Sequence, residues 1–240
     1  MRALFLLLTL AGLSAPVLAA GLSKSVSQYA RDMEDYYKNG RPEALPGLLR
    51  IFDSQGVLAD GEKRLVTAAF LAHALRRGPE ARQHLLSKPE NYGDHARKTL
   101  AWAVHLACLP DEPALLAVLI RAGEAALLRQ IQASPAPLER WNIYSELSVL
   151  RMYWTAFLAS GDAGLLDAIV AAALRYADLS AAGLRGHADF AVSAAAAALL
   201  YEQTPRHEAV RARVRAALDK EPRTGGRADT LRSILRDAGG

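Results

Sequence analysis

The sequence predicts an all-α protein. Alanine and leucine, which favour helices, dominate its 240 residues, and no segment alternates apolar and polar side chains as a half-buried strand does. Glycine and proline fall between blocks of helically spaced apolar side chains, where helices end and begin. With 51% hydrophobic and 22% charged residues, the chain can bury a full core, which excludes a disordered tail protein.

Residues 1–20 have the pattern of a secretory signal peptide. Arg2 precedes an apolar run over residues 3–13, which is too short to span ~30 Å of hydrocarbon, and small residues follow near the end of the segment. We expect cleavage after Ala19 or Ala20 and a periplasmic or secreted mature protein with no transmembrane span. The alternative is an uncleaved N-terminal anchor helix.

Glycine and proline indicate where the helices in the first half of the mature chain begin and end. Gly40 and Gly56 end the first two, and Pro42 stands in the first turn of the second. Gly78 ends the third, whose last turn is basic, and Pro110 follows the fifth. The predicted helices are 24–38, 42–56, 61–77, 79–87 and 94–109.

Glycine and proline also mark the ends of the helices in the second half of the chain. Pro113 lies in the first turn of one helix, and residues 134–137, Ser-Pro-Ala-Pro, are expected to form a rigid link. Gly161 ends a long apolar helix, and Asp162 can cap the helix that follows it. The predicted helices are 113–122, 124–132, 138–160, 163–176, 187–202, 205–218 and 228–237.

Short turns pair these helices into antiparallel hairpins. The pairs are 94–109 with 113–122, 138–160 with 163–176, and 187–202 with 205–218. The first helices begin 44 and then 49 residues apart, so no fixed repeat exists. We therefore expect a single domain over residues 21–240, built as an irregular α-solenoid unlike the 34-residue tetratricopeptide repeat. A compact α bundle is the alternative.

Three stretches resemble blocks of an uncharacterised family of exported bacterial helical proteins. The resemblance rests on Met33–Tyr37 followed by Pro42 and Leu45-Pro46, on Trp154 with residues 156–162, and on Ala194–Leu199 followed by Pro205 and His207. It implies an all-α exported protein and carries no activity, cofactor or site residue.

No standard catalytic motif occurs, and we predict no catalytic residue, metal site or cofactor. The chain lacks a G-x-S-x-G elbow and a phosphate-binding glycine loop. His105 and Cys108 share a helix face as two metal ligands could, but packing in the core explains both, and we expect Cys108 to be buried. It is the only cysteine, so neither a disulfide within the chain nor a lipid anchor at the cleavage site is expected.

Two smaller polar groups have structural explanations as well. Asp32 and Asp35 share a helix face beside two tyrosines, as an acid–base pair would, but a solvated face with the aromatic side chains turned inward explains them too. His187 and Asp189 stand at a predicted helix start, where capping is their expected role.

The predicted helix 138–160 is apolar around most of its circumference, which is typical of a buried helix, and we expect Trp154 and Phe157 in the core. Its charged side chains therefore need partners or a groove. Pairing with another helix is one interpretation. The other is a groove that is lined by Tyr144, Glu146, Arg151 and Tyr153.

The C-terminal end is basic. From Thr204 onward there are nine basic and five acidic residues, which gives this segment a charge of +4. We predict that it folds back as a terminal cap and leaves its arginines in solvent. Alternatively, Arg211, Arg213 and Arg215 form a basic surface that meets an acidic protein or an anionic lipid.

These observations favour a non-catalytic exported scaffold that binds another protein. An enzyme acting on cell-envelope material, with carboxylates such as Glu146 or Asp35, is a second hypothesis. A periplasmic immunity protein that neutralises a toxin is a third. Export makes nucleic acid an unexpected partner despite the sequence pI near 9.3.

Overall fold

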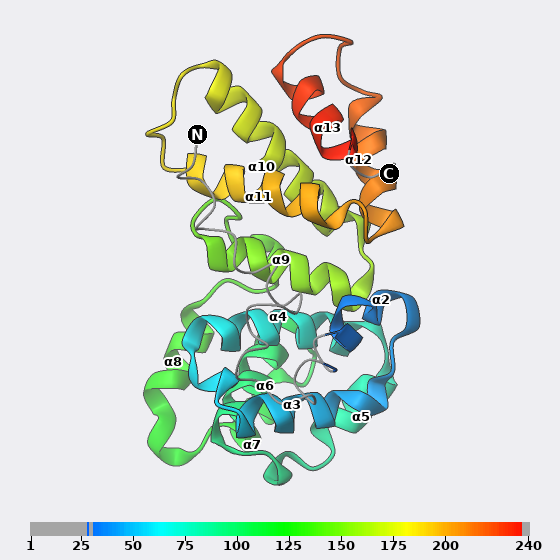
Figure 1. The fold of residues 1–240 in the computed structure, drawn as a ribbon. Coiled ribbons are helices and arrows are strands. Elements are labelled where there is room, and N and C mark those ends of the chain that lie inside the picture. The colour runs from blue at the N-terminus through cyan, green and yellow to red at the C-terminus, as the bar shows by residue number, and fades with distance from the viewer. Residues whose placement is uncertain (1–27, 29–30, 237–240) are drawn as a thin grey trace. The chain divides into compact units, whose positions relative to one another are not determined.

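The computed structural model describes Gln28 and residues 31–236 (Figure 1). Within these residues the chain forms α-helices, short 3-10 helices and turns, and none of them belongs to a strand, so the all-α prediction is confirmed. No helix in the described part of the chain is both long enough and apolar enough to cross a bilayer. The predicted signal peptide lies outside the described residues.

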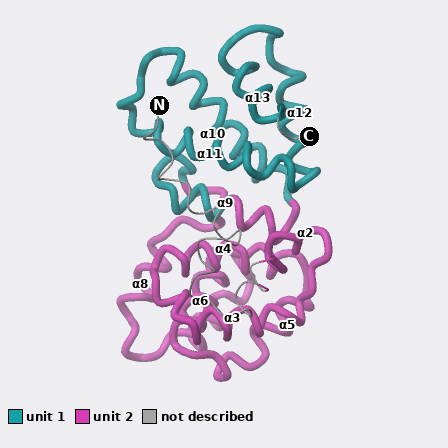
Figure 2. The backbone as a smooth tube through the Cα atoms, viewed as in Figure 1, with its two compact units in different colours: residues 1–13, 142–153, 162–240 teal, residues 14–141, 154–161 magenta. Residues whose placement is uncertain are grey.

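The chain divides into two compact units (Figure 2). Among the described residues, unit 2 comprises the chain up to Trp141 together with Trp154–Gly161. Unit 1 comprises Asn142–Tyr153 and the chain from Asp162 onward. The single domain and the irregular solenoid stay predictions.

Unit 2 is built around α4 (Gly61–Arg77) and α6 (Asp94–Ala107), which pack extensively against each other. Most side chains of both helices are buried. The other α-helices of this unit are α2 (Tyr36–Asn39), α3 (Leu45–Ser54), α5 (Pro79–Leu86), α7 (Glu112–Leu119) and α8 (Ala125–Ala133). Its 3-10 helices are η2 (Pro42–Ala44), η3 (Val57–Ala59), η4 (Pro89–Asn91), η5 (Ala122–Glu124) and η6 (Leu138–Arg140).

Helix α4 has the bounds that its sequence predicts. The Asp60 side chain accepts hydrogen bonds from the backbone N–H groups of Glu62 and Lys63, at 2.9 and 3.2 Å, and so satisfies two donors that have no partner within the helix. Basic residues occupy the last turn, and the helix ends at Gly78. The sequence was enough to predict these bounds, because the residues directly outside the helix, Asp60 and Gly78, define its two ends.

Unit 1 is organised around α10 (Ala163–Ala181). It packs against α11 (Phe190–Gln203), and also against α12 (Glu208–Leu218) and α13 (Gly226–Arg236). Helix α9 (Leu147–Ser160) contributes its first seven residues to this unit and the rest to unit 2.

The predicted helix 138–160 is wrong in its first half. Residues 138–140 form η6, and the chain then turns before α9 begins at Leu147. The Asn142 side chain accepts a hydrogen bond from the Tyr144 N–H at 3.1 Å, and the Ser145 hydroxyl donates to the Asn142 carbonyl at 2.7 Å. Such local bonds compete with helical ones, which explains the late start. The second half is buried as predicted, with Trp154 9% and Phe157 0% exposed.

Candidate functional site

The four residues of the predicted groove occupy two kinds of structure. Tyr144 and Glu146 lie in the turn before α9, and Arg151 and Tyr153 lie on the helix itself. Glu146 is exposed, Tyr144 and Arg151 are half-buried, and Tyr153 is 6% exposed. Tyr144 and Glu146 therefore do not lie on the helix that carries Arg151 and Tyr153, and the groove stays a prediction.

Tyr144 instead lies near charged residues of α10 and of the start of α11. Burial raises the pKa of Tyr144, the charge of Arg175 opposes this shift, and that of Asp189 adds to it. Arg175 Nη2 is 3.5 Å from Asp189 Oδ2.

His187 Nδ1 accepts the Asp189 N–H at 3.2 Å, so the proton of the neutral ring is on Nε2. The predicted helix-capping role is not observed, because Asp189, the N-cap residue of α11, makes no side-chain cap hydrogen bond and His187 instead closes the turn before the helix.

The C-terminal arginines are more engaged than the sequence suggests. Arg213 on α12 donates to both carboxylate oxygens of Asp167 on α10. Arg227 on α13 does the same with Asp178, eleven residues further along α10, at 2.7 Å for each bond. Because eleven residues are about three helical turns, both carboxylates lie on one side of α10.

These pairs add a role that the sequence did not predict for the basic end. The side chains of Arg213 and Arg227 stay 37% and 48% exposed, and their charges also attach α12 and α13 to α10. Arg211 pairs with Glu208 at 3.1 Å within its own helix, whereas Arg215 is exposed. The sequence could not identify Asp167 and Asp178 as partners, because they lie 46 and 49 residues from Arg213 and Arg227 along the chain. A basic binding surface at Arg211, Arg213 and Arg215 stays a prediction.

A cavity of about 360 Å³ lies beside the predicted acidic cluster in unit 2. Asp32 faces it and contacts Gln28 Nε2 at 3.0 Å and Arg41 Nη2 at 3.5 Å, while Asp35 pairs with Lys38 Nζ at 2.8 Å. The aromatic side chain of Tyr36, next to the acidic cluster, is turned inward as predicted and is 7% exposed. The cavity is lined by Gln28, Arg31, Asp32, Met33, Asp35, Tyr36, Asn39, Arg41, Ala44, Leu45, Leu48 and Phe70.

Cys108 is exposed, which corrects the expectation that it is buried. It ends α6 in the left-handed region, with φ = 50°, and its N–H donates to the His105 carbonyl at 3.0 Å. Its neighbours Ala107 and Leu109 are both buried, so of these three residues the turn exposes Cys108 alone. Both ring nitrogens of His105 have other partners, so the two residues do not form a pair of metal ligands. Nδ1 is 2.7 Å from Glu112 Oε1, and Nε2 is 3.0 Å from the Ser134 carbonyl oxygen.

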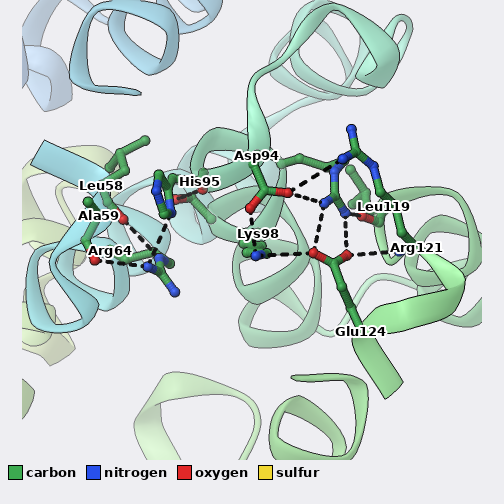
Figure 3. Close-up of polar contacts among 11 residues, drawn as sticks. Leu58, Ala59, Arg64, Asp94, His95, Lys98, Leu119, Arg121 and Glu124 are labelled. Carbon is green, nitrogen blue, oxygen red and sulfur yellow. Dashed lines mark hydrogen bonds and ion pairs between the residues drawn. The ribbon is translucent and has the colours of Figure 1, made fainter. Parts of the chain in front are cut away.

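A polar cluster in unit 2 contains Asp94, Lys98 and Glu124, whose contacts Figure 3 shows. Arg97 on α6 lies at its centre and binds both carboxylates. Arg97 is 4% exposed, and its Nη1 and Nη2 lie 2.8 and 2.9 Å from the two carboxylate oxygens of Glu124. Nη2 also donates to Asp94 Oδ1 at 2.6 Å, and Nη1 donates to the Leu119 carbonyl at the end of α7. Lys98 Nζ joins the same carboxylates, 2.6 Å from Asp94 Oδ2 and 3.1 Å from Glu124 Oε1.

Glu124 has a double role in this cluster. It accepts the backbone N–H of Arg121 at 2.9 Å, which caps the start of η5. Hydrogen bonding to Arg97 is the largest of the effects that lower the pKa of Glu124 from 4.5 to about 2. Bidentate pairing of a guanidinium with a carboxylate is strong and geometrically specific, so the end of α7 and the start of α8 are held on α6.

His105 holds both outer ends of the same segment. Glu112 is the first residue of α7, and Ser134 directly follows α8. Arg97 therefore holds the junction between α7 and α8 on α6, and His105, eight residues further along α6, holds the start of α7 and the end of α8. Apolar burial contributes as well, because Leu116 and Leu119 of α7 and Ile131 of α8 are buried, and burying such a side chain is worth about 1.5–3 kcal/mol.

The side of α7 that is turned away from α6 is apolar and exposed. We call its residues Pro113, Ala114, Ala117 and Val118 the outer face of α7. Val118 is 63% exposed, more than Leu184 at 50% or Tyr201 at 43%. Sequence analysis missed this surface because a helix with one charge in eight residues has the composition of a core helix.

Metal binding has no obvious site in the described residues, which contain no group of three or more His, Cys, Asp and Glu side chains placed to hold an ion. The chain matches no protein-family model, and neither the curated proteins nor the solved structures contain a significant match to it. The resemblance to exported bacterial helical proteins thus stays a prediction.

Proposed function

We propose that this chain is an exported, non-catalytic helical protein that binds another protein through the outer face of α7. The observation that carries the proposal is the 63% exposure of Val118 within a helical face whose other members are also apolar. Single exposed hydrophobic residues are ordinary, whereas a contiguous apolar face is typical of an interaction site.

The way in which α7 is held supports the same function. His105 fixes the start of α7 and the end of α8 to α6, and Arg97 fixes the junction between α7 and α8 to it. Helix α6 is itself part of the core of the unit. A binding surface that is already ordered loses less conformational entropy when a partner docks. A rigid helix with an exposed apolar side is therefore well suited to recognition.

Export is the second part of the proposal. It is supported by Arg2, the apolar run over residues 3–13 and the small residues up to Ala20. N-terminal sequencing of the protein from the envelope or secreted fraction tests it. We expect the mature chain to begin at Ala20 or Gly21, and an intact Met1 would contradict export by cleavage.

Photo-crosslinking tests the binding surface. A photoreactive residue at position 118 should capture a discrete partner in the compartment where the protein resides, and Val118→Asp should prevent co-purification of that partner. Leu184→Asp is the matched control, because Leu184 is also exposed but belongs to unit 1. Equal loss of the partner in both variants, with unchanged melting, would refute a specific role for α7.

The alternative of an enzyme acting on envelope material is favoured by one observation, the cavity beside Asp32 and Asp35. It combines carboxylates with an apolar floor, as small-molecule sites do. Hydrolysis assays on cell-wall fragments with Asp32→Asn and Asp35→Asn variants would test it. Activity that is present in the wild type and absent in both variants would favour the enzyme over the binding protein.

A further inference from the structure

Both ring nitrogens of His105 lie against hydrogen-bond acceptors. Nδ1 is 2.7 Å from the Glu112 carboxylate, and Nε2 is 3.0 Å from the Ser134 carbonyl oxygen. An ionised carboxylate and a carbonyl accept hydrogen bonds but do not donate them. Because a neutral imidazole carries one N–H, it makes one of these bonds, and a ring with two N–H groups makes both. The observed geometry is therefore that of an imidazolium.

The surroundings of the ring make its second proton important. His105 is 7% exposed, and the Trp102 ring stands edge-on to it, with 6.4 Å between the two centroids. Water has little access to such a ring, so it does not readily replace a partner that is lost. A neutral ring would turn a nitrogen lone pair towards one of the two oxygens.

The bond to Ser134 is the one that a neutral ring loses. A hydrogen bond to an ionised acceptor is roughly twice as strong as one between neutral groups. The single proton of a neutral ring therefore stays on Nδ1, beside Glu112, and Nε2 is left facing the carbonyl. The start of α7 stays attached, whereas the end of α8 loses its bond to α6.

We propose that His105 is a proton-operated latch between α6 and the end of α8. The latch is closed when the ring carries both protons, and it opens at Ser134 as the pH rises through the titration of the ring. Its stabilisation is thus present at the lower pH and lost at the higher one, which is the sign expected for a histidine that gains acceptors on folding. The latch acts within unit 2 and does not depend on the binding partner proposed above.

The neighbouring elements bring other titratable side chains to this end of α6. Besides Glu112 they include His73 and Arg76 of α4, Asp111, Glu139 and Arg140 of η6, and Cys108. Arg76 and Glu139 pair at 2.7 Å, so their charges offset each other. Burial raises the pKa of the Cys108 thiol, so this group stays neutral at the pH values at which histidine titrates.

Nitrogen-15 NMR of the full mature chain distinguishes the two states of the ring. Between about pH 5 and 8, where histidine usually changes charge, we expect His105 to lose the proton on Nε2 and to keep the one on Nδ1. Amide exchange at the end of α8, expressed as protection factors, should become roughly tenfold less protected over the same titration, because local opening depends on the bonds that hold a segment. The amides of α4 should keep their protection.

Glu112→Gln is the most informative variant, because it should keep the latch closed. A glutamine amide can donate to Nδ1, so a neutral ring can hold its proton on Nε2 for Ser134. We therefore expect protection at the end of α8 to become independent of pH. His84→Gln is the matched control, because His84 is exposed on α5 in the same unit and its loss should leave the wild-type behaviour in place.

Several outcomes would overturn the inference. A His105 ring with one N–H at about pH 5 would do so, as would a ring that keeps both protons up to about pH 8. Protection at the end of α8 that stays constant while the ring titrates would reject the latch as well. So would Glu112→Gln with the pH dependence of the wild type, or His84→Gln without it. If Glu112→Gln does not fold, the wild-type measurements decide the inference by themselves.

Discussion

Arg97 and Glu124 form a two-point ion pair across 27 residues of sequence, with 2.8 Å between Nη1 and Oε2 and 2.9 Å between Nη2 and Oε1. Arg97 comes from the first half of α6, and Glu124 from the 3-10 turn that leads into α8. The pair thus closes the loop of chain that contains α7. Because Leu116 and Leu119 of α7 are also buried, we expect the position of the helix to depend on this pair together with apolar packing.

Removing the Glu124 charge should destabilise unit 2. Glu124→Gln keeps the shape but leaves Arg97, which is 4% exposed, with a weaker partner. Loss of one member of a buried ion pair costs about 3–5 kcal/mol, and the partial exposure of Glu124 reduces our expectation to roughly 2–3 kcal/mol. Urea melts of the wild type and the variant measure the change in the free energy of unfolding. A difference below about 0.5 kcal/mol, the usual effect of a surface substitution, would show that the pair is not structural.

The same pair makes a defined contribution to acid stability. Arg97 lowers the pKa of Glu124 in the folded chain to about 2, whereas the ordinary value is 4.5. The stabilisation is therefore complete above about pH 4.5 and is lost as the pH falls towards 2. We expect the stability difference between wild type and Glu124→Gln to shrink by on the order of 1–3 kcal/mol across this window, allowing for solvent screening. A stability difference between the two proteins that does not vary with pH would show that Glu124 does not cause this acid dependence.

A side chain at Gly93 should displace the Asp53 carboxylate. A Cβ at this position would overlap Asp53 Oδ2, the end of a flexible side chain on α3, which packs against α6. Because that carboxylate can rotate away, we expect Gly93→Ala to cost less than about 1 kcal/mol. Gly61→Ala is the control, because nothing lies within 4 Å of its Cβ. Combining Gly93→Ala with Asp53→Ala should recover part of the loss, and additive effects in the double-mutant cycle would refute the overlap.

Trp154 should contribute strongly to the core. It is 9% exposed and stacks near Phe157, with 5.4 Å between the ring centroids. Replacing Trp154 by Ala should cost roughly 3–5 kcal/mol, because the cavity cannot collapse fully. Denaturant melts measure the change, with Val118→Ala as an exposed control expected to be near neutral. A loss below about 1 kcal/mol would place Trp154 outside the packed core.

The paired and unpaired arginines of α12 should respond differently to substitution. Arg213→Ser removes the bidentate pair with Asp167 and should lower the melting temperature of unit 1. Arg215→Ser, on an exposed position of the same helix, should leave it unchanged. The difference should diminish in high salt, because the Arg213 pair is at the surface. Equal melting temperatures for the two variants at low salt would contradict a structural role for Arg213.

Local signals in the sequence were enough where a helix is defined by its own neighbours. The bounds of α4 follow from Asp60 at one end and Gly78 at the other. The same signals failed before α9, where the Asn142 side chain bonds to the backbone and delays the helix. They also failed at Cys108, where the chain leaves α6 in the left-handed region although no glycine is present.

The outer face of α7 could not be predicted from the sequence, for a different reason. The composition of α7 is that of a buried helix, and nothing within its eight residues says which side faces solvent. That decision depends on residues outside the helix, since Arg97 binds the junction between α7 and α8 and His105 binds the start of α7 and the end of α8.

The amino-acid sequence by itself determined the helical class and the places where most helices begin and end, because helix propensity and capping act over a few neighbouring residues. The tertiary structure decided which charges are paired and which apolar residues stay exposed. Pairs such as Arg213 with Asp167, or Arg97 with Glu124, join residues far apart in the chain, and only folding brings their atoms within hydrogen-bond distance. The exposure of Val118 follows from the same long-range arrangement, since it depends on which side of α7 is placed against α6.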